Sequence, residues 1–148
     1  MNIVVLINPG RAAPYVMMDL SEHFNAMGHN STLIKIGDLF TLQSPPNSME
    51  GFHEFCRKIQ ALNPDVVIGY GAIPLMYYRI EDGPVVNVLQ SMKIPMTGIF
   101  YDDPFQKDVF PAVAGMAYSD IYHLFVWDNY YVKELEKLCF KNVHYMPI

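Results

Sequence analysis

Carboxylates that directly follow apolar runs are the residues of this sequence whose position best suits chemistry. Asp102-Asp103 comes after the run that ends at Tyr101, and Asp128-Asn129 comes after the next such run. Asp103 and Asp128 have a structural alternative that we favour, because Asp103-Pro104 and Asp128 each suit the start of a helix. Asp102 is not placed to start a helix in this way. We therefore expect Asp102 to be the functional carboxylate.

Two glycine-containing turns follow other apolar runs and could complete a site. Gly10-Arg11 ends the first run, and Gly71 lies in Gly69-Tyr70-Gly71. Gly10 suits the turn itself, and Arg11 is either a solvated cation or, with the helix start behind it, a contact for an anionic or hydroxylated ligand. Aromatic residues near the same run ends are either core or a lining that stacks on sugars and bases. They are Tyr70, Tyr77, Tyr78, Tyr101, Phe105 and Phe110.

The motifs of several well-known sites are absent. One glycine follows the first run where G-x-G-x-x-G needs three, and the chain has no Gly-Lys phosphate loop and no G-x-S-x-G elbow. His53-Glu54 begins like a zinc-protease helix, but Arg57 occupies the second histidine position. The five histidines do not cluster, and Cys56 and Cys139 lie far apart. We expect no cofactor and no metal.

Composition predicts one domain over residues 1–148 and excludes several classes of protein. Charged residues make up only 17% of the chain, against about 25% in typical domains, so part of the surface is expected to meet a ligand, a partner or another domain. The net charge of −5 without a basic run argues against nucleic acid. No apolar run approaches the ~20 residues of a membrane span, and the start is unlike a signal peptide, which favours the cytoplasm.

Short β-branched runs alternate with helical patterns along the whole chain. Strands are predicted near residues 2–7, 31–36, 65–69, 96–101, 122–127 and 143–146. Helices are predicted near 12–27, 49–62, 85–92 and 109–118, and from 129 to 140. This alternation predicts an α/β fold, a Rossmann-like three-layer sandwich with a mostly parallel six-stranded sheet in the order 3-2-1-4-5-6. In that order the Gly10-Arg11 loop lies beside Asp102 at the switch point between strands one and four.

Five short motifs occur in an order that resembles a known family. They are Asn63-Pro64-Asp65-Val66-Val67-Ile68, Met92-Lys93-Ile94-Pro95, Tyr101-Asp102-Asp103-Pro104, Val126-Trp127-Asp128-Asn129-Tyr130 and Lys141-Asn142-Val143-His144-Tyr145-Met146-Pro147. The set resembles the N-terminal half of CgeB-like (spore-maturation-protein-like) glycosyltransferases of the GT-B architecture. The resemblance covers nearly the whole chain.

The resemblance implies an enzyme with two Rossmann-like halves that face each other across a cleft. The C-terminal half binds the nucleotide-sugar donor, and the N-terminal half contacts an acceptor that the sequence does not identify. This chain ends where the linker to a second half would begin, so the isolated domain is expected to be inactive. The face that meets the second half could also pair with itself in a homodimer.

The same resemblance implies roles for the candidate residues. No histidine sits plainly at the end of a strand, so Asp102 or Asp103 is the expected general base for the acceptor hydroxyl. The other expected substrate contacts lie in the neighbouring loops. They are Gly10, Arg11, Gly71, Tyr101, Asp128 and Asn129.

Two other classes of protein remain open. One is a stand-alone flavodoxin-like module that binds a small ligand or signals at the same switch point, without enzymatic activity. The other is a small α/β enzyme that uses the Asp102-Asp103 pair directly, which is disfavoured because no nucleophile accompanies the carboxylates. The codons beyond Ile148 discriminate between the transferase and the stand-alone module. A second βα-rich half with a phosphate-binding glycine loop favours the transferase, and a stop codon favours the module.

Overall fold

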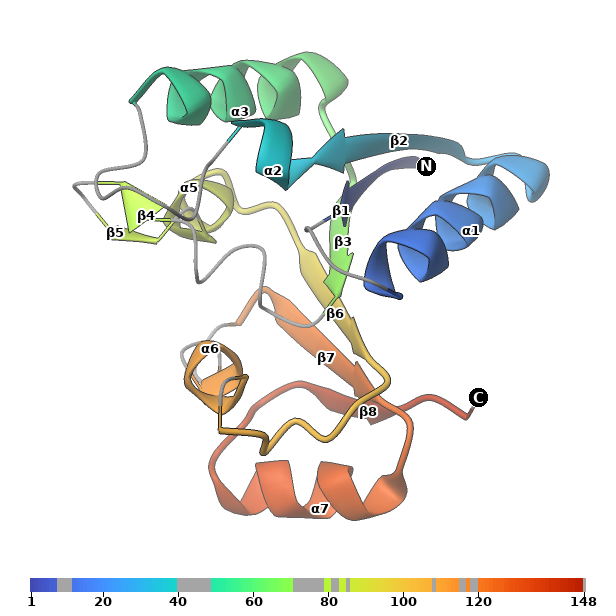
Figure 1. Ribbon diagram of the computed structural model, residues 1–148, viewed down its shortest axis with the longest axis vertical. Helices are drawn as coiled ribbons and strands as arrows, with labels where there is room; N and C mark the ends of the chain where they lie inside the picture. The colour runs from blue at the N-terminus through green and yellow to red at the C-terminus, as the bar shows by residue number, and fades with distance from the viewer. Residues whose placement is uncertain are drawn as a thin grey trace.

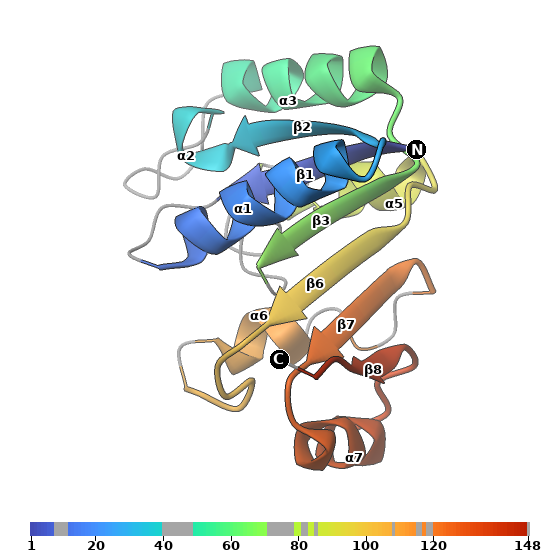
Figure 2. The ribbon, with the colours of Figure 1, turned by 90° about the vertical axis from the view of Figure 1, so that its right-hand side faces the viewer.

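Six parallel strands form the central sheet of the protein. The computed structural model describes residues 1–7, 12–39, 49–70, 79–80, 83–84, 86–107, 109–114, 117 and 120–147. Every neighbouring pair of strands in this sheet is parallel, as Figure 2 shows. The strands are β1 (Asn2–Ile7), β2 (Asn30–Lys35), β3 (Val66–Tyr70), β6 (Met96–Phe100), β7 (Tyr122–Val126) and β8 (Val143–Tyr145). The predicted Rossmann-like α/β sandwich is confirmed.

The helices follow the predicted pattern with shifted ends. They are α1 (Ala13–Ala26), α2 (Ile36–Leu39), α3 (Met49–Leu62), α5 (Val86–Ser91), α6 (Phe110–Ala114) and α7 (Asn129–Lys137). Helix α3 has the predicted bounds, whereas α6 and α7 end before the predicted residues 118 and 140. The sequence did not predict α2, nor the short antiparallel pair β4 (Arg79–Ile80) and β5 (Gly83–Pro84).

The order of the strands differs from the prediction. It is β2-β1-β3-β6-β7-β8, which is 2-1-3-4-5-6 along the chain rather than 3-2-1-4-5-6. The reason lies in β2, whose residues Asn30, Ser31 and Thr32 are polar and of which only Ile34 is buried. Such a strand belongs at the edge of a sheet. Strand β1 is apolar along its length and takes the interior position.

Strand β3 is fixed beside β1 at its first residues. Ile3 pairs with Val66 in register, and the Asp65 carboxylate accepts a hydrogen bond of 2.8 Å from the backbone N–H of Asn2. This bond joins residues that are 63 positions apart. The start of the chain is therefore held in the middle of the sheet by a segment from its centre.

Helices cover the two faces of the sheet unequally. One core gathers Val4 and Leu6 with side chains from α3, α5, α6 and α7, such as Phe55 and Leu135. The other gathers Ile3, Val5 and Ile7 with Met17 of α1. Among the described residues, α1 is the only helix on this second face, where Figure 1 shows it alone beside the sheet.

Four helices lead into the next strand of the sheet through a residue with positive φ. These residues are Gly28, Asn63, Lys93 and Cys139, with φ of 86°, 42°, 57° and 67°. At Gly28 the chain closes with two backbone hydrogen bonds of 3.0 Å, Gly28 N–H to the Asn25 oxygen and His29 N–H to the Phe24 oxygen. Helix α1 thus ends at Ala26, close to the predicted end at residue 27.

We predict that Tyr122→Phe stabilises the fold. Tyr122 is 3% exposed, and its hydroxyl has no hydrogen-bond partner among the described residues. Removing an unmet buried hydroxyl should raise the free energy of unfolding by about 1 kcal/mol, measured by urea denaturation. Tyr15→Phe is the control, because Tyr15 is 69% exposed and its hydroxyl is already in water. A less stable Tyr122→Phe would show that the hydroxyl is bonded after all.

Candidate functional site at the carboxyl end of the sheet

Asp102 and Tyr70 meet where two neighbouring parallel strands end. The arrowheads of β3 and β6 point to the same end of the sheet in Figure 2. Tyr70 is the last residue of β3 and pairs in register with Ile99 of β6, so the residues just after β6 lie next to it. The Tyr70 hydroxyl donates a hydrogen bond to Oδ2 of Asp102. The strand pairing, rather than any local motif, therefore creates this pair.

The Tyr70 ring is held between two aromatic neighbours. Its centroid lies 5.1 Å from that of buried Phe100 and 6.2 Å from that of Tyr101, whose ring plane is inclined to it by 30°. Burial raises the pKa of Tyr70, and the hydrogen bond to Asp102 and the negative charge of that carboxylate raise it further. Burial also raises the pKa of Tyr101. Both phenols are therefore neutral near pH 7, and Tyr70 is a hydrogen-bond donor.

The two adjacent carboxylates differ in what they contact. Asp102 is exposed, and among the described residues only Tyr70 forms a hydrogen bond with its side chain. Asp103 is half-buried, and its Oδ1 accepts a 2.9 Å hydrogen bond from the Phe105 N–H. The chain turns here, and α6 begins only at Phe110. Asp103 therefore closes a turn, and the expectation that it starts a helix is wrong.

Asp128 caps the last helix, as the sequence predicted. Its Oδ1 accepts a 2.8 Å hydrogen bond from the Tyr130 N–H at the start of α7. Strand β7 is the neighbour of β6, so the Asp128-Asn129 turn lies along the same end of the sheet as Asp102. Asn129 is exposed at the first position of α7.

An aromatic cluster joins the Asp103 turn to the Asp128 turn. Tyr131 is its centre, because its ring lies 6.1 Å from Phe105 and 5.8 Å from Trp127 between centroids. Burial and then the negative charges of Asp103 and Asp128 raise the pKa of Tyr131. The rim formed by these strand ends thus carries two groups of aromatic rings, one around Tyr70 and one around Tyr131, near three aspartates. Trp127 and Tyr130 are exposed on this rim.

The observed strand order changes which loops are neighbours. Strand β3 lies between β1 and β6, so the end of β1 is not beside Asp102, and the switch point falls between β1 and β3. The expected switch point between strands one and four, on which the placement of the Gly10-Arg11 loop beside Asp102 was based, is therefore wrong. Gly10, Arg11 and Gly71 themselves lie outside the described residues.

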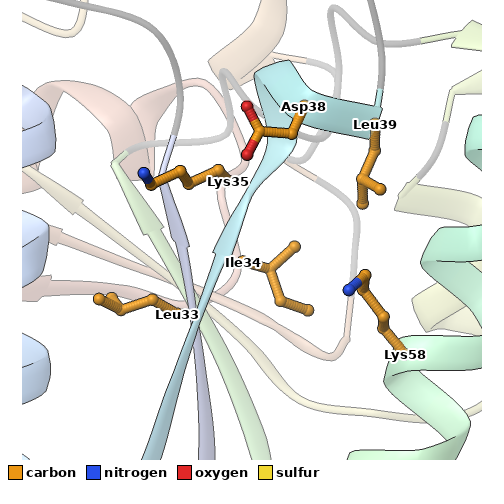
Figure 3. A pocket seen from close by; sticks show the side chains of 6 residues that line it. All are labelled: Leu33, Ile34, Lys35, Asp38, Leu39 and Lys58. Carbon is orange, nitrogen blue, oxygen red and sulfur yellow. The ribbon is translucent and has the colours of Figure 1, made fainter.

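Two surface hollows that the described residues form lie away from Asp102 and Asp128. One of about 300 Å³ lies between β2, α2 and α3, shown in Figure 3. Its lining is mixed in charge, and the Lys35 ammonium points away from Lys58 there. It is lined by Leu33, Ile34, Lys35, Asp38, Leu39 and Lys58. A second hollow of about 290 Å³ lies on the α1 face and is almost wholly apolar, with Ile68, Ile99 and Phe125 among the residues that line it.

Two of the histidines come together, contrary to expectation. His123 on β7 and His144 on β8 share a hydrogen bond of 3.0 Å between Nδ1 and Nε2. Burial and then the neighbouring His123 lower the pKa of His144. In the part of the chain that the structure describes, no group of three or more metal-ligating side chains is present.

Comparisons with known proteins add no assignment. No protein-family model matches this chain. A search of curated proteins also gives no match. Among the described helices, none is both long and apolar enough to span a membrane.

We predict that Asp128 contributes to stability through its cap. Asp128→Ala removes the acceptor of the Tyr130 N–H and should lower the free energy of unfolding by about 1 kcal/mol, measured by urea denaturation. Asp128→Asn is the matched control, because asparagine caps helices as well as aspartate does and should retain most of the stability. Equal losses in both variants would show that the charge, not the cap, stabilises the helix.

Proposed function

We propose that this chain is the acceptor-side domain of a glycosyltransferase, which moves a sugar from a nucleotide-sugar donor to an acceptor hydroxyl. The observation that carries the proposal is the exposed Asp102 carboxylate at the carboxyl end of a doubly wound sheet, held by Tyr70 and flanked by aromatic rings. Open α/β sheets bind ligands at this end of their strands. Carboxylates and aromatic rings are suitable partners for a sugar-like ligand with many hydroxyls. The motif resemblance supports the same function.

Asp102 is the base in this proposal. Its carboxylate takes the proton of the acceptor hydroxyl while the acceptor oxygen bonds to the anomeric carbon of the donor sugar. The bond from that carbon to the nucleotide diphosphate breaks, and the diphosphate leaves with the electron pair. Asp103 is less suited to this role, because its Oδ1 already accepts the Phe105 N–H.

The donor-binding half supplies the remaining part of the reaction. It holds the nucleotide and stabilises the negative charge of the leaving diphosphate. On this chain, Tyr101 is half-buried beside Asp102, where its ring can support an acceptor. Trp127 and Tyr130, exposed further along the rim, extend the same surface.

A specific observation favours a second candidate, a stand-alone small-ligand-binding module. The first five strands of the sheet have the order 2-1-3-4-5, which is the flavodoxin-like order, with its ligand crevice between β1 and β3. That crevice is one strand away from Asp102. The two candidates therefore place the ligand at different strand ends, and Asp102 is essential only to the transferase.

We predict that residues 1–148 alone do not turn over nucleotide sugars, because the proposed donor site lies on another half. The measurement is nucleotide release from a panel of UDP-, GDP- and TDP-sugars. Robust turnover by this chain alone would contradict the division between donor and acceptor halves. A natural stop codon after Ile148 with tight binding of a small ligand would support the module instead.

We predict that Asp102→Asn impairs transfer in the enzyme that joins this chain to a donor-binding half. Loss of the base should slow single-turnover transfer by roughly a hundredfold or more. Asparagine keeps an oxygen for the Tyr70 hydroxyl, so the melting temperature should change little. Asp120→Asn is the control, because Asp120 precedes β7 at the other end of the sheet, where it pairs with Lys141, and it should transfer normally. Normal transfer by Asp102→Asn would show that this carboxylate is structural.

A further inference from the structure

We propose that Tyr70 is a positioning residue for Asp102, which it holds so that Oδ1 is the oxygen that takes the acceptor proton. This inference rests on the proposed function, because it assigns Asp102 the role of base. The geometry that supports it is the hydrogen bond from the Tyr70 hydroxyl to Oδ2 of Asp102.

Tyr70 is well placed to fix another side chain. It is the last residue of β3, so its backbone belongs to the sheet, where Gly69 and Tyr70 pair with β6. Its ring packs on Phe100, which is 1% exposed, and beside Tyr101. Asp102 lies beyond the end of β6 and is itself exposed. A side chain anchored in the sheet therefore orients one that is not.

The hydrogen bond from Tyr70 makes the two oxygens of the Asp102 carboxylate different from each other. Oδ2 accepts the phenol hydrogen, whereas Oδ1 has no partner among the described residues. Oδ1 is thus the oxygen with free lone pairs for an incoming hydroxyl.

Asp103 and Asp128, which lie at the same end of the sheet, have the hydrogen bonds that are typical of a structural aspartate. Each accepts a hydrogen bond from a backbone N–H two residues further along the chain. Asp102 instead pairs with a side chain from another strand, 32 positions away in the sequence. A contact of this kind closes no local turn and caps no helix. Orientation of the carboxylate is the effect that it does have.

The first test measures the orientation directly in the chain of 148 residues. In the wild-type protein, NMR couplings about χ1 of Asp102 should report a single rotamer, and in Tyr70→Phe they should average between rotamers. The couplings of Asp128, which is held by its own cap, should not change. Averaged couplings in the wild type, or a fixed rotamer in Tyr70→Phe, would overturn the proposal.

The second test follows the phenol from the other side of the hydrogen bond. With ¹³C-labelled tyrosine, and Tyr70→Phe to assign the resonance, the pKa of Tyr70 should fall toward its ordinary value in Asp102→Asn. Burial keeps it above that value, because burial is the larger cause of the shift. Tyr101, whose pKa burial alone raises, is the control and should titrate as before. An unchanged Tyr70 would contradict the pairing.

The third test separates this inference from the proposed function. In the enzyme with its donor-binding half, Tyr70→Phe should lower kcat on the order of tenfold with little change in KM. If Asp102→Asn transfers normally, the proposed function fails. If Asp102→Asn is impaired but Tyr70→Phe keeps a normal kcat, only the positioning role fails.

Discussion

The burial of β1 on both faces is the constraint on which the rest of the structure depends. Alternate residues of this strand enter the two cores, with Val4 and Leu6 on one side and Ile3, Val5 and Ile7 on the other. A strand of this kind needs a hydrogen-bonded neighbour on each side and a layer above and below. Strands β2 and β3 supply the neighbours, so β3 becomes the link between β1 and the half of the sheet that carries Asp102.

The sequence predicted the elements of the fold better than their order. Continuous apolar runs such as Ile3–Ile7 define strands locally, and the helix stop at Gly28 needs only the conformational freedom of glycine. The order of strands depends on which faces are buried, and the relevant signal was the polar start of β2 at residues 30–32. Giving that polarity more weight would have placed β2 at the edge. Lys93 and Cys139 show a different limit of prediction from sequence, because lysine and cysteine do not favour the positive φ that these two residues adopt.

The candidate site was predictable only where it is local. The Asp128 cap follows from residues adjacent in the sequence, and the sequence anticipated it. The partner of Asp102 could not be found in this way, because Tyr70 reaches it only when β3 and β6 are neighbours. Tyr70 was noted as an aromatic residue near the ends of the strands, but its hydroxyl acquires a hydrogen-bond partner only from the strand order. For the same reason, the expected contact between the first loop and Asp102 depended on a strand order that the protein does not have.

The interior position of β1 also has a consequence for how the chain folds during synthesis. Its neighbour β3 and the Asp65 carboxylate that binds the Asn2 N–H are 63 residues away, so both emerge from the ribosome long after the first strand. Until then the apolar segment from Ile3 to Ile7 can pair only with β2, which is largely polar. Non-local pairings of this kind slow folding and leave apolar strands open to association with other chains. The hydrogen bond from Asn2 to Asp65 therefore marks the earliest stage of translation at which the N-terminal strand can be enclosed on both sides.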